Sequence, residues 1–583
     1  MATIGELLRL ILPDLISEDR SQISPPSFPP DMFGVSAYLL QQSGAYHRVV
    51  PGPIPGYSTD GLLVIDQNLI SDCRETALQW SKSPFIPDRV KQLWNKLLAA
   101  QNDEVHIELH STSKHPAWWI YAYSLMVISD EACEDVGYRP SDHGTWIENV
   151  VDVALDKANQ GSKLVQGQQR KWNHLYTITL YANQDIFCVQ PKARTPDVGC
   201  ALRSISHNLA LLPPKGQIQI NWQKALNSQI TDDERSLNLL LIPFPYEIRD
   251  EAFVAGDLFN TDFDAKPWGW FSIDQSWLGN EPQRVVKFLA DIIDRAHSEH
   301  GQIHGIVLPE YALNWAAYEM LAEHIRKTWR DVEFLISGSS GNCSGTSGNF
   351  ALCSFFDIGP DEKDNPQRTV THTSRGKHHR WRLEKYQIEK YGLGAQLPLS
   401  VEGTFWWESI ALEGREIHIN PMRSASLFTV MICEDLARSD PCHEPLKSVG
   451  PNLVFVLLMD GPQLSERWSA RYSMGLAEDP GSSVLTLTSR ALLERWNSEE
   501  DDDSKKVWSV GLWKDDKSRV TPLICSPEGH AVLLKLSGKK VKEMTLDGRS
   551  AKEAFAWRLH PETVPVQIEV TESWTRFASE LRG

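Results

Sequence analysis

The stretch Ser426–Asp435, with the sequence SLFTVMICED, decides how the rest of the chain is interpreted. Its apolar and β-branched residues from Leu427 to Ile432 predict a buried strand that runs directly into Cys433. An apolar strand that stops abruptly at Cys-Glu-Asp is typical of a nucleophile presented at a strand end. Cys433 is therefore our candidate nucleophile.

Two earlier stretches supply the side chains that a reactive thiol needs. In HGIVLPEYAL (304–313) an apolar strand ends at Glu310, and WRLEKYQI (381–388) carries Lys385 inside an alternating segment. A thiol of ordinary pKa is mostly protonated at neutral pH, so Glu310 would serve as its base. Lys385 would balance the negative charges and stabilise an oxyanion, with the backbone N–H of Glu434 as a second donor.

Each of these residues also has a structural explanation when it is taken alone. A Cys at a strand end is usually part of a core, a Lys in a strand is usually solvated, and a Pro-Glu pair is usually a turn. Their occurrence together, in this order, predicts attack on an amide or nitrile carbon. This chemistry requires no metal and no organic cofactor.

The composition is that of an ordinary globular protein, with 41% hydrophobic and 23% charged residues among 583. The net charge of −18 argues against a general nucleic-acid-binding surface, although it leaves a local basic patch open. The nine Cys are scattered without CxxC pairs, which favours free thiols in a reducing compartment. We therefore expect a cytoplasmic protein.

The sequence shows no membrane segment, because no apolar run approaches the roughly 18–20 residues that span a bilayer. At the N-terminus, Glu6 and Arg9 interrupt the brief apolar centre of MATIGELLRLILPDL, and no small-residue cleavage site follows. We interpret this segment as a short docking helix that ends before Pro13.

Residues 1–230 are predicted to form a separate α+β domain for which the sequence names no chemistry. His106, Glu108 and His110 would share one face of a strand, which is a possible metal-binding pattern. No further ligand follows at metal-site spacing, so a polar strand face is the favoured interpretation and no metal is predicted. The pair Trp118-Trp119 is most simply part of a core.

Residues 235–583 are predicted to form a second, layered α/β domain, because strands and helices alternate from Leu237 onward. LNLLLIPF (237–244) and GIVL (305–308) read as buried strands. Between them a helix begins at Asn280 and Pro282, and its apolar positions form one face. These positions are Val285, Phe288, Leu289, Ile292, Ile293 and Ala296. The acidic run NSEEDDDSKK (497–506) reads as a solvated loop.

The candidate set resembles the nitrilase, or carbon–nitrogen hydrolase, superfamily. The resemblance rests on LPEYAL around Glu310, on EKYQI with Lys385 and Ile388, and on VMICED around Cys433. The sequence Cys-Glu-Asp-Leu is similar to the amidase domains of glutamine-dependent NAD synthetases. The resemblance covers about residues 235–540.

This resemblance implies a four-layer α-β-β-α sandwich and a Glu-Lys-Cys triad that acts through a Cys thioester. It also implies a homodimer or higher homo-oligomer that acts on a small amide or nitrile. Many members carry a second active-site Glu shortly after the Lys, and the chain offers Glu389 and the more distant Glu402. Lys390 competes with Lys385, which is favoured for its K-x-x-apolar context.

Two further functions stay open from the sequence. A nitrilase-like domain can act as a dimerising or sensing module in a larger assembly, as in those fused to bacterial antiviral reverse transcriptases. This chain lacks the Tyr-x-Asp-Asp polymerase motif. The other possibility is a glutaminase subunit that supplies ammonia, without a synthetase of its own because no GxxxxGK[ST] signature occurs.

Overall fold

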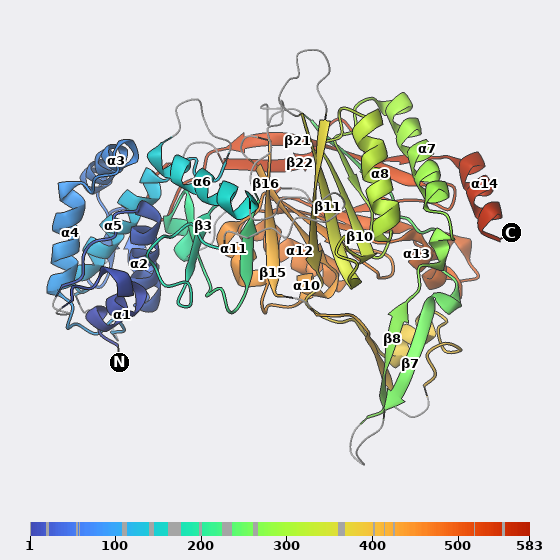
Figure 1. Cartoon of the computed structure of the whole chain (residues 1–583), viewed down its shortest axis with the longest axis horizontal. Coiled ribbons are helices and arrows are strands. Elements are labelled where there is room, and N and C mark those ends of the chain that lie inside the picture. Colours follow the sequence, from blue (N-terminus) through green and yellow to red (C-terminus); the bar gives the residue numbers. More distant parts are fainter. Residues whose placement is uncertain are drawn as a thin grey trace.

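The fold is a mixed α/β structure with several sheets and a group of helices at its N-terminal end (Figure 1). A computed structural model of the chain describes residues 2–18, 22–53, 56, 59–107, 114–138, 145–160, 176–196, 201–223, 236–259, 266–358, 368–399, 403–412, 414–423, 426–517, 519–550 and 554–582. Among these residues, none of the helices combines the length and apolarity needed to cross a bilayer.

The N-terminal helical part, residues 2–160, forms one hydrophobic core together with residues between 178 and 209. Its helices are α1 (Ile4–Ile11), α2 (Pro29–Gln42), α3 (Gln67–Lys82), α4 (Asp88–Ala99), α5 (Trp118–Ala132) and α6 (Trp146–Gln160). The predicted docking helix is confirmed as α1, which begins at a capping box in which Thr3 and Glu6 bond each other's backbone N–H. Trp118 and Trp119 are buried in this core, as predicted.

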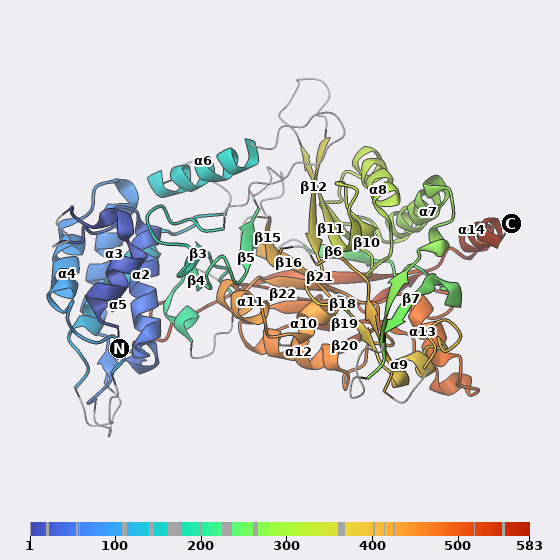
Figure 2. The ribbon, with the colours of Figure 1, turned by 60° about the horizontal axis from the view of Figure 1, so that its bottom comes forward.

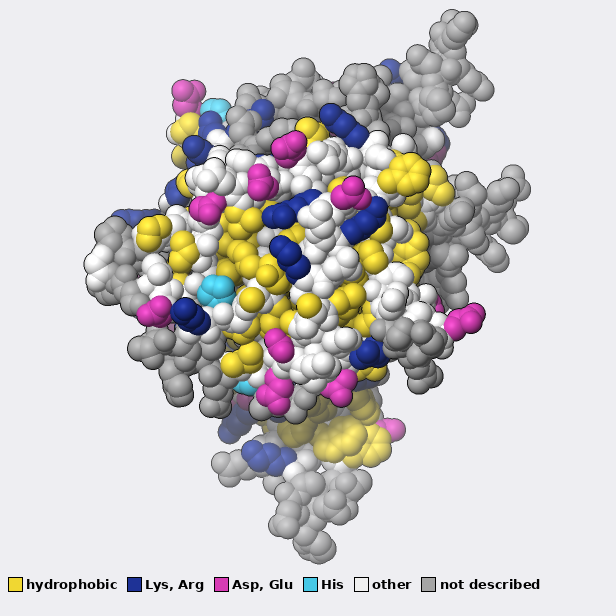
Figure 3. All heavy atoms as spheres, turned by 90° about the vertical axis from the view of Figure 1, so that its left-hand side faces the viewer, with side chains coloured by type: hydrophobic (Ala, Val, Ile, Leu, Met, Phe, Trp, Pro, Cys, Tyr) yellow, Lys and Arg dark blue, Asp and Glu magenta, His cyan; other side chains and the backbone are white. Residues whose placement is uncertain are grey.

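Strands are few in the N-terminal region of the described chain. The pairs are β1 (Val49–Val50) with β2 (Leu63–Val64), and β3 (Cys188–Pro191) with β4 (Leu209–Leu212). Seen from this end of the molecule, apolar side chains are spread over a broad area, with a few Lys and Arg among them (Figure 3). Leu78 on α3 and Phe85 beyond it are more than half exposed.

The first sheet contains the strand that leads to Glu310. Its order is β12 (Arg368–Gly376), β11 (Ser347–Ile358), β10 (Phe334–Gly341), β9 (Gly305–Val307), β6 (Leu237–Leu241), β21 (Ala531–Val541) and β22 (Ala554–Leu559), and β23 (Val566–Ile568) pairs with β21. β6 and β9 are parallel and wholly buried, which explains why they read as continuous apolar runs.

The second sheet contains the strand that leads to Cys433. Its order is β20 (Thr521–Ile524), β19 (Ser509–Lys514), β18 (Ser483–Leu487), β17 (Leu453–Leu457), β16 (Ser426–Ile432), β15 (Glu416–Met422) and β5 (Gln219–Trp222). The predicted strand from Leu427 to Ile432 is confirmed as β16. β5 precedes the domain boundary expected near residue 230, yet it pairs with β15 in this sheet.

The two sheets pack against each other and helices cover their outer faces. In β6, Leu239 and Leu241 share a hydrophobic cluster with β16 and β17, whereas Leu240 packs with residues of α7 (Pro282–His300) and α8 (Trp315–Thr328). Figure 2 shows α7 and α8 on one side of the sheets. The helices on the other side are α10 (Glu434–Ala437), α11 (His443–Val449) and α12 (Trp468–Glu478).

A smaller third sheet extends away from the two large ones, as β7 and β8 show in Figure 1. Its order is β13 (Arg382–Leu383), β14 (Phe405–Glu408), β8 (Trp268–Ile273) and β7 (Phe253–Phe259). The remaining helices are α9 (Lys385–Lys390), α13 (Arg490–Asn497) and α14 (Thr571–Arg582).

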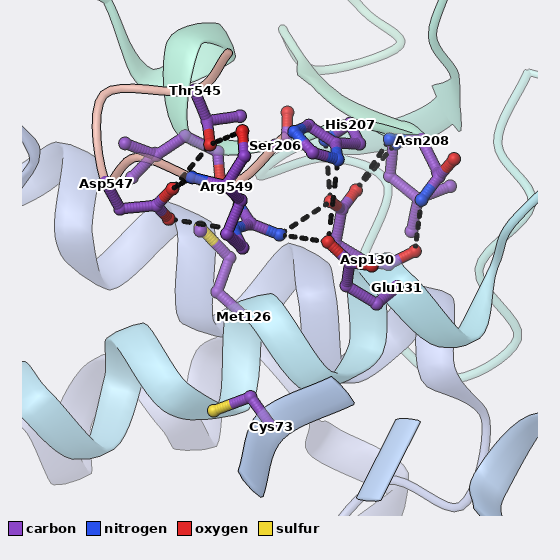
Figure 4. A network of polar contacts seen from close by, with 12 residues as sticks. Cys73, Met126, Asp130, Glu131, Ser206, His207, Asn208, Thr545, Asp547 and Arg549 are labelled. Carbon is purple, nitrogen blue, oxygen red and sulfur yellow. Dashed lines mark hydrogen bonds and ion pairs between the residues drawn. The ribbon is translucent and has the colours of Figure 1, made fainter. Parts of the chain in front are cut away.

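A buried polar network joins the N-terminal helical part to the C-terminal segment after β21 (Figure 4). Asp130 on α5 accepts backbone hydrogen bonds from His207, Asn208 and Leu209 at 2.6, 2.9 and 2.9 Å. Arg549 donates to Glu131 and to Asp547 at 2.6 and 2.9 Å. Both parts therefore contribute charged side chains to one network, and folding shields most of these charges from water.

Candidate active site

Glu310 lies in a tight turn directly after β9. The next residue, Tyr311, has a positive φ of 57°, and β10 passes immediately behind this turn at Gly338. A Cβ atom at Gly338 would lie 2.4 Å from the Cα of Glu310, so only glycine permits this approach. The predicted strand before Glu310 is β9, which ends at Val307, three residues earlier than expected, and the Glu310 side chain is buried.

The lysine beside Glu310 is Lys377, the residue that directly follows β12. Its Nζ donates hydrogen bonds to Glu310 Oε1 at 2.9 Å and to Glu408 Oε2 at 2.8 Å. All three side chains are buried. Lys377 and Glu408 occupy the positions that the sequence analysis assigned to Lys385 and to Glu389 or Glu402.

Lys385 is not at this site, and the structure corrects that assignment. It is the first residue of helix α9, its side chain is 63% exposed, and its Nζ lies 3.8 Å from the carboxylate of Glu389, another exposed residue. Lys390 pairs with Glu499 at 3.7 Å and lies over the ring of Trp496. The K-x-x-apolar pattern therefore marks an amphipathic helical turn, not a strand.

Two other expectations fall partly outside the described residues. Glu402 is outside them, and so are Glu108 and His110 of the N-terminal His-Glu-His pattern. Within the described part of the chain, no group of three His, Cys, Asp or Glu side chains is arranged to hold a metal ion.

Asn349 on β11 completes the carboxylate cluster. Its Nδ2 donates to Glu310 Oε1 at 2.6 Å and to Glu408 Oε1 at 2.8 Å. Glu408 also accepts from the Tyr311 hydroxyl and the Trp381 backbone N–H, each at 2.8 Å. By contrast, Glu310 Oε2 is buried without a hydrogen-bond partner among the described residues. One oxygen of Glu310 is thus held in place and the other is available.

The electrostatics give the two glutamates different properties. Burial, together with the negative charge of Glu408, raises the pKa of Glu310 above its ordinary value, although Lys377 opposes this. Burial also disfavours the charge on Glu408, but Lys377 and several hydrogen bonds outweigh it and lower the pKa of Glu408. Glu310 is therefore the carboxylate that exchanges a proton more readily.

Lys377 remains charged in this setting. Burial favours its neutral amine, yet the carboxylates of Glu310 and Glu408 outweigh burial and raise the pKa of Lys377 well above its usual range. A cation that is fixed by two carboxylates offers a permanent positive charge in a water-poor site.

Cys433 lies in a strained turn between β16 and α10. Its φ and ψ are 41° and −109°, which non-glycine residues rarely adopt, and its backbone N–H donates to Leu457 O at 2.9 Å. A sharp strand-to-helix turn is the geometry that presents a nucleophile in many hydrolases. The Cys433 side chain follows the predicted strand, and Glu434 is the first residue of α10.

The surroundings of Cys433 favour the neutral thiol over the thiolate. Burial and the negative charge of Glu310 raise the pKa of the thiol well above its usual range, and the positive charge of Lys377 opposes them. The turn that carries Cys433 lies against the turn that carries Lys377, because Asp435 accepts a hydrogen bond from the backbone N–H of His378 at 3.1 Å. The arrangement can therefore support a buried thiol that loses its proton to a neighbouring carboxylate.

One simple signal in the sequence could have identified Lys377. Glu310, Lys377 and Cys433 all follow the end of a strand, in RGK at 375–377 as in LPE and MIC. The strand before Lys377 is hard to recognise in the sequence, because its residues at 371–376, THTSRG, are mostly polar. Glu408 gave a weaker signal because its short strand, FWWE, belongs to the separate third sheet.

Comparisons with known proteins give matches in fold alone. No family model and no curated protein matches the sequence. Solved structures that match include an amidase from Nesterenkonia sp. and Nit3 from Saccharomyces cerevisiae, a member of branch 10 of the nitrilase superfamily. A carbon–nitrogen hydrolase from Helicobacter pylori also matches.

These matches extend over about three fifths of the chain. They cover 61, 59 and 60% of this chain and 98, 94 and 93% of the Nesterenkonia, yeast and Helicobacter chains, respectively. The sequence identity is 11% and the TM-score 0.26 in each case. The remaining two fifths of the chain lie outside these matches.

Proposed function

We propose that this chain hydrolyses the carbon–nitrogen bond of a small amide or nitrile, with Cys433 as nucleophile, Glu310 as base and Lys377 as electrostatic stabiliser. The observation that carries the proposal is the way in which the two carboxylate oxygens of Glu310 are hydrogen-bonded. Its Oε1 is held by Asn349 and Lys377, whereas its Oε2 has no hydrogen-bond partner among the described residues. A carboxylate with one oxygen anchored and the other unpaired is held in position and can still accept a proton, which suits a general base.

For an amide, the reaction proceeds in two halves. Glu310 takes the thiol proton as Cys433 attacks the carbonyl carbon, and Lys377 stabilises the oxyanion. The carbon–nitrogen bond then breaks as Glu310 returns the proton to the leaving nitrogen, which gives a thioester and free ammonia or amine. Water, deprotonated by Glu310, attacks the thioester, releases the acid and restores the thiol.

Glu408 supports this chemistry through Lys377. Its hydrogen bond to Nζ, together with its lowered pKa, keeps a permanent negative charge beside the lysine. This charge stabilises the Lys377 cation and helps to raise the pKa of Glu310. The backbone N–H of Glu434, the predicted second oxyanion donor, immediately follows Cys433 and stays a prediction.

A second candidate function is a nitrilase-like module that dimerises or senses a ligand within a larger assembly, including an antiviral one. The burial of Cys433 favours it, because the residue is only 4% exposed. The large N-terminal helical part also favours a specialised role. We propose that either form is a homodimer or higher homo-oligomer, which light scattering coupled to gel filtration measures directly.

Brief treatment with iodoacetamide, followed by intact mass measurement and peptide mapping, separates the two functions. Selective labelling of Cys433 among nine thiols, slowed in Glu310→Gln, supports an activated nucleophile. Amides, nitriles and glutamine are then tested for ammonia release, with Cys433→Ala as the inactive control. Absent labelling of Cys433 and no ammonia from any substrate would instead favour the module.

A further inference from the structure

The outer face of the third sheet carries a cluster of aromatic side chains. β8 and β14 are parallel neighbours, with Trp268 opposite Phe405 and Trp270 opposite Trp407. Because side chains alternate along a strand, these four rings share one face. They are in contact, since the centroids are 5.6 Å apart for Trp268 and Trp270 and 5.8 Å apart for Phe405 and Trp407.

This aromatic face of the third sheet does not pack into the hydrophobic core. The alternate residues Phe271, Trp406 and Glu408 point the other way and are buried, with Glu408 bound to Lys377. The four aromatic residues of the outer face are only partly buried. A sheet that exposes several large rings on one side, while its other side supports the site, has a surface suited to a ligand.

Cationic side chains surround these rings and form a groove, which we call the Trp–Arg groove. Its volume is about 760 Å³. Its described lining contains no acidic residue and consists of Trp268, Trp270, His378, His379, Arg380, Arg382, Phe405, Trp407, Leu412 and Arg438.

The arginines of the groove already lie against the rings. Arg380 is 5.3 Å from the centroid of Trp270, and Arg382 is 5.5 Å from that of Trp407. Arg382 also pairs with Glu384, and Arg438 pairs with Glu434 at 2.9 Å. The Nε of Arg380 is buried and has no hydrogen-bond partner in the described part of the chain. Arg380 also donates to Ile410 O at 3.0 Å, but no carboxylate pairs with it among the described residues, so its positive charge is available beside flat apolar surfaces.

We propose that the Trp–Arg groove binds a free nucleotide. The indole faces offer stacking surfaces for a planar base, and the guanidinium groups are suited to a phosphate. The net charge of −18 opposes a long polyanion, whereas the local positive charge attracts a small anion. The groove volume also lies within the range of about 300–1,000 Å³ that is usual for small-molecule sites.

The groove adjoins the segments that carry the candidate active site. His378 and His379 directly follow Lys377, and Arg438 lies five residues after Cys433. The proposal nevertheless does not rest on the proposed hydrolysis, because nucleotide binding can be measured without turnover. Cys433→Ala should bind nucleotide as the wild type does, and a loss of binding in that variant would count against the groove as the site.

Titration calorimetry with the full chain tests the proposal. Adenosine 5′-monophosphate should bind, and adenosine and inorganic phosphate alone should each bind more weakly. Trp407→Leu should weaken nucleotide binding about five-fold or more through lost stacking. Arg382→Gln should weaken it about ten-fold or more through the lost charge. The matched controls are Tyr386→Leu and Lys385→Gln, two exposed side chains of nearby α9 outside the groove, which should change nothing.

Several outcomes would overturn the proposal. The first is no binding of the monophosphate by the wild type, and the second is binding that neither groove variant weakens. A short oligoadenylate that binds more than about ten-fold tighter than the monophosphate would identify a single strand as the ligand instead. Self-association that Arg382→Gln abolishes, without nucleotide binding, would identify a second copy of the chain. If Trp407→Leu lowers the melting temperature, Arg382→Gln decides, since the Arg382 side chain is 47% exposed and lies outside the core.

Discussion

Asp435, two residues after Cys433, forms a buried ion pair with Arg375, two residues before Lys377, with 2.8 Å between Oδ2 and the guanidinium. Asp435 Oδ1 also accepts from the backbone N–H groups of His378 and His379 at 3.1 and 3.2 Å. One carboxylate therefore ties the turn that carries the thiol to the turn that carries the lysine, although the two turns come from different sheets.

Replacing this carboxylate should disorder the lysine turn. Burial opposes the charge of Asp435, but Arg375 and the neighbouring histidines outweigh it and hold its pKa well below its usual range. Asp435→Asn would leave the buried Arg375 without its carboxylate countercharge, which costs about 3–5 kcal/mol in comparable cases. Chemical denaturation should show this loss, and turnover should fall as well. An unchanged midpoint would show that the ion pair does not hold the turns together.

The lysine assignment leads to a direct comparison of variants. Lys377→Ala should lower kcat by about 100-fold or more, because it removes the cation beside Glu310 and Cys433. Lys385→Ala and Lys390→Ala should leave kcat nearly unchanged, since both side chains lie on α9 away from the carboxylate cluster. Steady-state assays of the three variants decide the matter, and a severe loss in Lys385→Ala with a mild one in Lys377→Ala would reverse the assignment.

The raised pKa of Glu310 should be visible in the pH profile. A base must be deprotonated to act, so kcat/KM should fall as the pH drops through the pKa of Glu310. Because burial and Glu408 raise that pKa, the acidic limb should lie above the ordinary carboxyl value of 4.5. In Glu310→Gln the remaining activity should lose this limb. A limb that persists in the variant would belong to another group.

Gly338 should be sensitive to a single methyl group. A Cβ atom there meets backbone atoms of the Glu310 turn at 2.4–2.6 Å, so Gly338→Ala must displace that turn or β10. We expect a loss of about 1–3 kcal/mol in the free energy of unfolding, together with reduced kcat. Gly341→Ala on the same strand is the control, since its nearest contact would be 3.4 Å. Equal thermal melts and activities for both variants would contradict this explanation.

The network around Arg549 predicts how the two parts of the chain depend on each other. Arg549→Met removes the cation and leaves Asp130 and Asp547 buried near each other, which should lower stability by about 3–5 kcal/mol. Arg74→Gln is the control, because Arg74 also pairs with Glu131 but is 41% exposed, and it should cost at most about 1 kcal/mol. Denaturation curves that coincide for the two variants would argue against a structural role for Arg549.

The sequence predicted the elements whose apolar pattern is strong. β16 before Cys433, β9 before Glu310 and α7 after Pro282 each bury a continuous apolar run or one apolar helix face, so their pattern is local. Glu310 and Cys433 became candidates because each follows an apolar, buried strand that ends abruptly. This rule fails for Lys377, because β12 lies at the edge of its sheet and has mostly polar residues.

Other features depend on contacts between distant segments and leave no local signal. Glu408 becomes part of the site only because the third sheet turns one face toward Lys377. The region near Leu175–Tyr181 alternates in sequence like a strand, yet it is irregular where the structure describes it. Similarly, nothing near Asp130 indicates that its countercharge is Arg549.

The long sequence separation between Asp130 and its countercharge Arg549 has a consequence for folding during synthesis on the ribosome. Glu131 and Arg549 are separated by 418 positions, and Tyr123 donates to Asp547 across 424 positions at 2.6 Å. The helices of the N-terminal part leave the exit tunnel long before Asp547 and Arg549 are synthesised, so at first Asp130 has only its backbone donors at 207–209. The charge network that buries Asp130 and Glu131 can therefore be completed only after Arg549 has emerged.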